Sequence, residues 1–297
     1  MAMTQQHSTA LTPPQPPLLL REVLARGRLV RAAGAHTALG ASLVEEAGFD
    51  AVWASSFEIS AARCLPDASL LTMTDYLQAA IQMQEACRIP VVADVDTGFG
   101  GNMNVAHMVR EYERGGISAV CMEDKVFPKM NSFVETEHSL LDAEAFCRKI
   151  EVAKSVQQGS DFHVIARTEA MIDGLGVDEA LDRCGRYADA GADSVLVHSK
   201  AATNCEILAF LAEWKRPVPV VIVPTTYPDW PAEEAHRAGV SVIIYANQSL
   251  RATVQSVRET LETICEEGTS VPVEDKIASV SEIFELQHLN DWREVEE

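Results

Sequence analysis

Val218-Pro219-Val220-Val221-Ile222-Val223 places five valine or isoleucine residues in six positions. A strand with one face in water alternates apolar and polar residues, whereas a continuous apolar run predicts a strand covered on both faces, as in a parallel sheet. The chain contains seven other short runs of strand-forming residues. The eight expected strands cover residues 29–36, 51–56, 91–96, 119–124, 163–169, 194–199, 218–224 and 240–247.

Segments with helical periodicity separate these runs, for example at residues 73–87, 102–114, 143–156, 177–190, 205–214 and 250–265. Several end on a glycine, as a helix often does just past its last turn. Eight β-then-α units predict an α/β fold of the (β/α)8 TIM-barrel type, which needs about 250 residues. A doubly wound open sheet is the alternative, but no GxGxxG follows an early strand. Residues 1–17 are expected to form a flexible arm, and residues 18–297 a single barrel domain whose C-terminal tail, 273–297, is helical.

The composition limits the choice of partners. The chain has 24 basic and 44 acidic residues, for a net charge of −20, and 47% of its residues are apolar. A field of this sign repels nucleic acid and anionic membranes, and no run approaches the roughly 18 apolar residues of a membrane span. The seven cysteines are odd in number and lack CxxC spacing, which favours reduced thiols in a cytoplasmic protein. A small molecule is therefore the expected partner, with no nucleic acid and no membrane.

Polar residues gather at the ends of the expected strands. In a (β/α)8 barrel the chemistry lies at the C-terminal ends of the strands, where packing alone gives little reason for ionisable side chains. Six or seven of the expected strands end on polar or ionisable residues, and together these ends predict a functional site. The residues are His36, Ser55, Ser56, Asp94, Asp96, Glu123, Asp124, Arg167, Glu169, His198, Ser199 and Asn247.

Three of these carboxylates predict a metal site. Asp94 and Asp96 are two positions apart on one expected strand, so their side chains should share a face, and Glu123 ends the next strand. Hard oxygen ligands favour Mg²⁺, or alternatively Mn²⁺, over Zn²⁺. The competing interpretation is that the two aspartates cap the helix that follows Gly98-Phe99-Gly100-Gly101.

Other candidates have a functional and a structural interpretation. Arg167 either pairs with Glu169 or grips a phosphoryl or carboxylate group as a fork. His198 taken alone favours a core position, but beside Arg167 it becomes an anion donor. Trp53 is either core or the wall of a small pocket. By default Lys125 and Lys129 would be solvated charges, and Asp67 an ordinary turn residue.

The chain also resembles the phosphoenolpyruvate mutase/isocitrate lyase superfamily over about residues 19–290, and most closely its mutase branch. The DxDTG signal of residues 94–98 and the EDKxxPK signal of residues 123–129 are together specific for the superfamily. Further matches lie at residues 52–55, 166–167, 197–200 and 273–277. The end of the loop, Lys129-Met130-Asn131-Ser132, is typical of the mutases. Lyases of the superfamily carry a Cys-Gly pair there, so a C–C lyase or decarboxylase reaction would lack its thiol acid.

The resemblance implies a Mg²⁺-dependent interconversion of phosphoenolpyruvate and phosphonopyruvate, an isomerase reaction of phosphonate biosynthesis. It also implies a homotetramer in which C-terminal helices are exchanged between subunits. The resemblance implies that Asp94 holds the metal directly and that Asp67, Asp96 and Glu123 reach it through water. It implies that Ser55 and the backbone N–H groups of Ser56 and Phe57 bind the oxyanion end of the substrate, in a pocket that includes Trp53 and Ser132. Asn131, Arg167 and His198 would hold the phosphoryl group, and Lys129 would help to close the loop as a lid.

Some residues depart from the mutase pattern. The family usually has glycine where this chain has Ser56, and Phe57-Glu58 and Phe99 are more similar to phosphonopyruvate hydrolase, which releases pyruvate and phosphate. The pattern of that hydrolase, however, has threonine in the loop where this chain has Asn131. A barrel that binds a phosphorylated ligand without turnover is a further alternative, although such a protein would be expected to have lost one of these residues.

Overall fold

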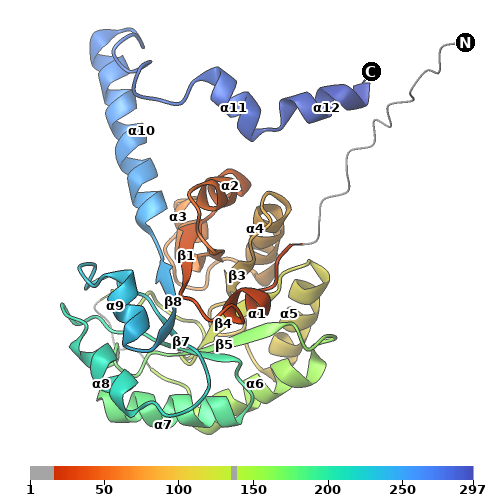
Figure 1. The fold of residues 1–297 in the computed structure, drawn as a ribbon, viewed down its shortest axis with the longest axis vertical. Coiled ribbons are helices and arrows are strands. Elements are labelled where there is room, and N and C mark those ends of the chain that lie inside the picture. The colour runs from red at the N-terminus through yellow and green to blue at the C-terminus, as the bar shows by residue number, and fades with distance from the viewer. Residues whose placement is uncertain (1–16, 135–138, 297) are drawn as a thin grey trace, which may run out of the picture. The chain divides into compact units, whose positions relative to one another are not determined.

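A computed structural model describes residues 17–134 and 139–296. These residues fall into two compact units, Pro17–Leu250 and a segment that begins at Arg251. The expected arm at residues 1–17 lies outside the described residues except for Pro17. In the first unit, eight parallel strands form a closed barrel in sequence order, and β1 pairs with both β2 and β8 (Figure 1). The strands are β1 Val30–Ala35, β2 Ala51–Ala54, β3 Val91–Asp94, β4 Ala119–Glu123, β5 His163–Thr168, β6 Ser194–Val197, β7 Val220–Ile222 and β8 Val240–Tyr245.

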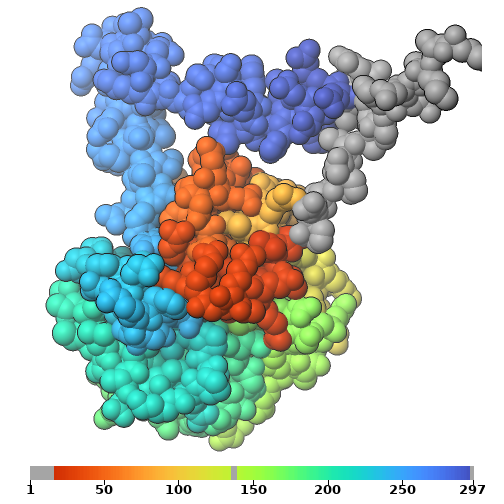
Figure 2. Space-filling model, in the orientation of Figure 1, coloured from red at the N-terminus to blue at the C-terminus, as the bar shows by residue number. Residues whose placement is uncertain are grey.

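Helices follow the strands and cover the outside of the barrel. In the space-filling view the red N-terminal part of the barrel lies beside the blue part near residue 250, where the barrel closes (Figure 2). The helices of this unit are α1 Leu20–Leu24, α2 Ala38–Glu46, α3 Ser56–Ala61, α4 Met73–Glu85, α5 Asn102–Arg114, α6 Ala143–Val156, α7 Gly176–Asp189, α8 Cys205–Glu213 and α9 Ala232–Arg237, and α10 Gln248–Glu267 begins in it. The predicted (β/α)8 fold is confirmed.

The strands are buried on both faces, as the apolar run at residues 218–223 predicts. Side chains such as Ala32, Val92 and Ile165 fill the barrel together with Leu20 and Val23 of α1. Their neighbours in sequence, such as Val91, Val120 and Val164, pack outward against the helices. This leaves the ends of the strands as the place where polar side chains can meet.

The second unit is helical, as expected for residues 273–297. It contains most of α10, followed by α11 Val280–Leu286 and α12 Leu289–Glu296. Within the described residues, no helix is both long enough and apolar enough to span a bilayer.

Every strand ends one or two residues before its expected end, and two of these differences change the site. β2 ends at Ala54, and Ser55 caps α3 by accepting a 3.2 Å hydrogen bond from the Glu58 amide, so Ser56 begins a helix. β3 ends at Asp94, and Asp96 lies in the following turn with φ +49°. A single rigid strand therefore does not place Asp94 and Asp96 on one face; the turn brings them together.

Candidate active site

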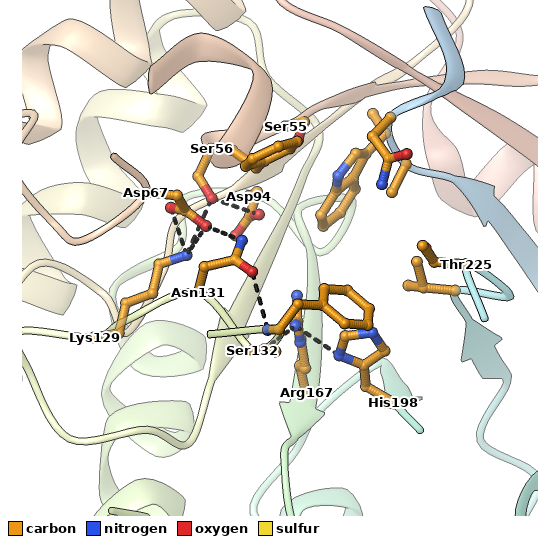
Figure 3. A pocket seen from close by; sticks show the side chains of 16 residues that line it. Ser55, Ser56, Asp67, Asp94, Lys129, Asn131, Ser132, Arg167, His198 and Thr225 are labelled. Atoms are coloured by element: carbon orange, nitrogen blue, oxygen red, sulfur yellow. Dashed lines mark hydrogen bonds and ion pairs between the residues drawn. The ribbon is translucent and has the colours of Figure 1, made fainter. Parts of the chain in front are cut away.

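A cavity of about 260 Å³ opens at the C-terminal ends of the strands. Most of the predicted site residues line it: Trp53, Ser55, Ser56, Phe57, Asp67, Asp94, Lys129, Asn131, Ser132, Arg167 and His198. Asp96 and Glu123 are buried beside these residues without lining the cavity. Asn247, which was also predicted at a strand end, lines it too. Phe133, Val223, Thr225 and Ala246 complete the wall, and sequence reasoning did not assign them to it. Thr225 lies across the cavity from Lys129 (Figure 3).

Lys129 joins the loop after β4 to the acidic side of the cavity. Its Nζ lies 2.8 Å from Asp67 Oδ1, 3.0 Å from Asp96 Oδ1 and 3.4 Å from Ser56 Oγ. Burial alone would lower the pKa of Lys129, but the surrounding carboxylates, Asp96 first, raise it well above its usual value. Lys129 is only 6% exposed and Lys125 only 2%, so the interpretation of both as solvated charges is wrong.

Two of the aspartates near Lys129, Asp94 and Asp96, have raised pKa values. Burial raises the pKa of Asp94, and burial together with the charges of Asp94, Asp67 and Glu123 raises that of Asp96 to about 7. Asp94 Oδ2 accepts a 2.8 Å hydrogen bond from Ser56 Oγ, and its Oδ1 accepts one from the Asp96 amide. Asp94 and Asp96 thus lie close together, although a turn and not a shared strand face places them so.

The same residues fit a divalent cation. Among the described residues, Asp67 Oδ1, Asp96 Oδ1 and Glu123 Oε1 are buried and accept no hydrogen bond. The first two lie within ion-pair distance of Lys129 Nζ. Within residues 17–134 and 139–296, no three acidic, histidine or cysteine side chains converge tightly enough to bind one ion directly. This arrangement suits Mg²⁺, which keeps several of its waters and binds through one or two carboxylates.

The turn that carries Asp96 has an unusual backbone. Asp96, Gly98, Phe99 and Gly100 all have positive φ angles. A Cβ on Gly98 would lie 2.7 Å from Met122 Sδ and 2.7 Å from Val105 Cγ2, so both the backbone angle and the space require glycine there. The buried Lys149 of α6 donates a 2.8 Å hydrogen bond to the carbonyl of Thr97. The glycine-rich stretch thus fixes the aspartate beside the cavity.

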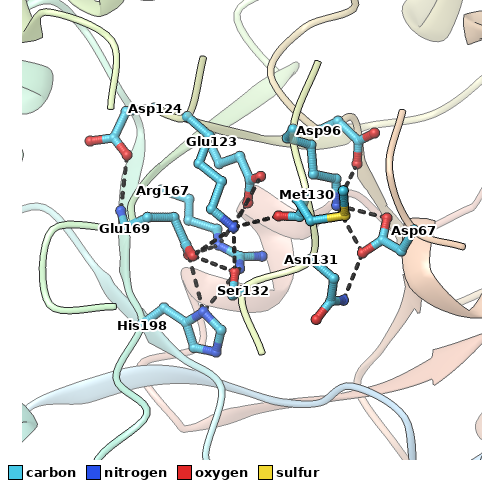
Figure 4. A network of polar contacts seen from close by, with 12 residues as sticks. Asp67, Asp96, Glu123, Asp124, Met130, Asn131, Ser132, Arg167, Glu169 and His198 are labelled. Atoms are coloured by element: carbon cyan, nitrogen blue, oxygen red, sulfur yellow. Dashed lines mark hydrogen bonds and ion pairs between the residues drawn. The ribbon is translucent and has the colours of Figure 1, made fainter. Parts of the chain in front are cut away.

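Arg167, His198 and Glu169 form the cationic side of the cavity (Figure 4). Arg167 Nε lies 2.5 Å from Glu169 Oε1 and 3.3 Å from Glu123 Oε2, so the predicted ion pair exists. Arg167 Nη2 lies 2.9 Å from His198 Nδ1. Burial, reinforced by Arg167, lowers the pKa of His198, although Glu169 opposes this. Because Arg167 and His198 also line the cavity, the ion-pair and anion-binding interpretations of Arg167 are compatible.

The loop after β4 places Asn131 and Ser132 between the two sides. Asn131 Nδ2 donates to Asp67 Oδ2 at 2.8 Å, while Asn131 Oδ1 accepts from the Phe133 amide. Ser132 Oγ accepts a 2.6 Å hydrogen bond from Lys125 Nζ and one of 3.3 Å from Arg167 Nη2. The loop therefore contacts both the acids and the cationic group.

Two buried carboxylates near this loop have different roles. Asp124 faces away from the metal candidates and accepts hydrogen bonds from Thr168 Oγ1, Tyr187 OH and Arg183. Glu169, which was predicted at a strand end and as a partner of Arg167, is fully buried and contacts four side chains. Its position at the end of a strand placed it among the predicted site residues, but the sequence did not indicate its contacts with Ser132 and His198.

Comparisons with known proteins agree with this geometry. A family model described as phosphoenolpyruvate phosphomutase matches residues 20–265. The chain is 44% identical to phosphonopyruvate hydrolase of Variovorax sp. (strain Pal2), over 93% of this chain and 96% of that protein. It is 41% identical to phosphoenolpyruvate phosphomutase of Tetrahymena pyriformis, over 88% of each chain.

Solved structures give a similar result. The crystal structure of phosphoenolpyruvate phosphomutase from Streptomyces platensis subsp. rosaceus aligns with a TM-score of 0.92 and 49% identity, over 93% of this chain and 96% of that one. A phosphonopyruvate hydrolase in complex with oxalate and Mg²⁺ aligns with a TM-score of 0.88 and 44% identity, over the same fractions.

Proposed function

The chain belongs to the phosphoenolpyruvate phosphomutase family, within the superfamily its motifs resemble, and on this premise we propose that it interconverts phosphoenolpyruvate and phosphonopyruvate. The reaction moves phosphorus between oxygen and carbon, which makes the enzyme an isomerase. We propose Mg²⁺ as the ion it requires, with Mn²⁺ as a possible substitute, and phosphonate biosynthesis as the process it serves.

The observation that carries the proposal is the position of Asn131. Its amide lies in the cavity and is held by Asp67 at 2.8 Å, on the loop that also contacts Arg167 through Ser132. In a C–C lyase of the superfamily this part of the loop would supply a thiol acid. None of the seven cysteines, all of which lie in the described part of the chain, lines the cavity. The residues present support phosphoryl transfer over carbon–carbon cleavage.

We propose that the two sides of the cavity have different roles. Asp94 would hold Mg²⁺, with Asp67, Asp96 and Glu123 acting through its waters; the bound ion would supply positive charge to stabilise the enolate oxygen. Ser55 and the amides at the start of α3, which have no acceptor within the helix, would bind the oxyanion end of the substrate.

The phosphoryl group would lie between Asn131, Arg167 and His198. A loose, metaphosphate-like transition state needs positioning and neutralisation of charge more than a strong acid or base. The planar fork of Arg167 can donate two hydrogen bonds to one phosphoryl group. The loop, with Lys129 buried beneath it, would exclude water that could otherwise trap the transferring group.

Phosphonopyruvate hydrolase is the second candidate. It is favoured by the 44% identity to the Variovorax enzyme and by the residues Phe57, Glu58 and Phe99. Incubating the purified protein with Mg²⁺ and phosphonopyruvate separates the two reactions, because ³¹P NMR distinguishes phosphoenolpyruvate from inorganic phosphate. Phosphoenolpyruvate supports the mutase, whereas stoichiometric phosphate with pyruvate refutes it in favour of the hydrolase.

We also propose that the protein is a cytoplasmic homotetramer that exchanges C-terminal helices between subunits. Apolar side chains on these helices, including Val257, Leu261, Phe284 and Trp292, are 46–63% exposed in the single chain. A second copy would cover such side chains. Light scattering coupled to size-exclusion chromatography measures the mass; a monomer would refute this part of the proposal.

A further inference from the structure

Glu169 contacts both Arg167 and His198, which line the cavity, through one carboxylate oxygen. Its Oε1 lies 2.5 Å from Arg167 Nε and 3.0 Å from His198 Nδ1. Its backbone is fixed as well, because its amide donates a 2.9 Å hydrogen bond to Asp124 Oδ1. The side chain is fully buried and is not among the residues that line the cavity, so it would act on substrate through its neighbours.

The other oxygen faces the loop. Oε2 accepts a short hydrogen bond from Ser132 Oγ and lies 3.3 Å from Lys125 Nζ. Lys125 Nζ also donates to the carbonyl of Met130 at 3.0 Å and to Ser132 Oγ. The backbone on both sides of Asn131 is thus tied to this carboxylate, directly or through Lys125 (Figure 4).

We propose that Glu169 is a positioning residue that couples the loop to the anion-binding pair: Oε2 holds the loop at Ser132 and Lys125, while Oε1 orients Arg167 and His198. The loop can then leave the cavity only by breaking hydrogen bonds to the same carboxylate that fixes these two side chains. The relevance to turnover rests on the proposed function, but the contacts themselves do not.

The atoms around His198 give this coupling a spectroscopic signature. A carboxylate only accepts hydrogen bonds and a guanidinium only donates them, yet His198 Nδ1 lies within 3.0 Å of both. Contact with Glu169 requires the proton on Nδ1, whereas a hydrogen bond from Arg167 requires a bare Nδ1. His198 Nε2 is buried and has no hydrogen-bond partner among the residues that the structure describes, and His198 lines the cavity. Glu169 therefore selects the Nδ1–H tautomer and leaves the Nε2 lone pair free.

Two measurements without substrate test the coupling in the full-length protein. In the Glu169→Gln variant, trypsin should cleave the loop after Lys125 and Lys129 about tenfold faster, because weaker contacts let the loop open more often. In ¹⁵N-histidine NMR spectra, assigned with a His198→Gln sample, His198 should change from the Nδ1–H to the Nε2–H tautomer as Arg167 becomes its donor.

Glu58→Gln is the matched control. Glu58 is also fully buried and also contacts a histidine Nδ1, that of His36 at 3.1 Å, but its side chain forms no hydrogen bond with the described part of the loop. Its variant should leave both the cleavage rate and the His198 tautomer unchanged.

Ser132→Ala tests the coupling from the loop side while keeping the buried charge, so it remains informative if Glu169→Gln fails to fold. It should speed cleavage and shift the His198 Nδ1 signal; combined with Glu169→Gln, it should add little. A changed tautomer with an unchanged cleavage rate would overturn the coupling, as would wild-type values of both. These results do not depend on whether the enzyme turns out to be a mutase or a hydrolase.

Discussion

Asn131 Nδ2 donates a 2.8 Å hydrogen bond to Asp67 Oδ2, and this bond joins two loops 64 positions apart in the sequence. The backbone strengthens the link, because the Asn131 amide donates to the Asp67 carbonyl at 3.0 Å. Burial would raise the pKa of Asp67, but Lys129 and the Asn131 side chain lower it, so the acid stays ionised. The residue that separates mutase from lyase thus lies against the predicted metal site.

Replacement of Asn131 by alanine should abolish the rearrangement. The phosphoryl group would lose a positioning donor, which we expect to lower turnover by about 10²-fold or more. Mg²⁺ binding should persist because Asp94 is untouched; ³¹P NMR measures the first and calorimetric titration the second. Near-normal turnover in this variant would refute the assigned role.

Threonine at position 131 should move the reaction toward hydrolysis. Threonine is the residue of the hydrolase pattern at this position. It is shorter than asparagine and has no amide to donate the hydrogen bond that Asn131 makes to Asp67. The ratio of inorganic phosphate to phosphoenolpyruvate, followed by ³¹P NMR, should rise relative to the unmodified protein. An unchanged ratio would mean that Asn131 does not control the access of water.

Mg²⁺ should stabilise the folded protein. A ligand present at about 100 times its Kd adds about 2.7 kcal/mol to the free energy of unfolding, which raises the melting temperature in a thermal scan. Asp94→Asn should lose this increase. Asp124→Asn is the control: it removes a buried carboxylate that faces Tyr187 and Arg183, so it lowers the starting stability but should keep the increase. Equal responses in the two variants would contradict the assignment of Asp94.

Modification of cysteines should leave turnover unchanged. Cys64, Cys205 and Cys265 are exposed, and none of the seven cysteines lines the cavity. Burial raises the pKa of Cys121 well above its usual value, so this thiol stays protonated and inert. Methylthiolation adds only a small group and can be counted by mass spectrometry. Loss of activity that parallels the modification would indicate a thiol acid, as in the lyases.

His163 should make the fold sensitive to acid. Burial lowers its pKa from 6.5 to about 4, so it is neutral in the folded chain. Between these two values the unfolded chain binds more protons, so stability is complete above pH 6.5 and falls as the pH drops toward 4. The loss from this group is about 2 kcal/mol between pH 7 and pH 5.

Urea unfolding at these two pH values measures the effect. Between pH 7 and pH 5, His163→Gln should lose about 2 kcal/mol less of its free energy of unfolding than the wild type. His107→Gln, at an exposed position, should lose as much as the wild type. An equal loss in wild type and His163→Gln would contradict the predicted pKa.

The sequence predicts the barrel because its strands, such as residues 218–223, are apolar on both faces, a pattern that few folds accommodate. It also predicts which residues meet at the strand ends. It does not predict how they meet. Asp96 reaches the site through a turn with positive φ, Ser56 through a helix start, and Lys129 through burial under its own loop. These positions depend on contacts between distant segments, which local patterns do not encode. For the same reason the sequence places Glu169 beside Arg167 but does not predict its contacts with Ser132, Lys125 and His198.

The most direct measurement of the central claim is the fate of phosphonopyruvate. With purified protein and Mg²⁺, ³¹P NMR should show the phosphonate signal replaced by that of phosphoenolpyruvate, and chelation of the metal by EDTA should stop the change. Formation of inorganic phosphate and pyruvate, with no phosphoenolpyruvate at any time, would contradict the account.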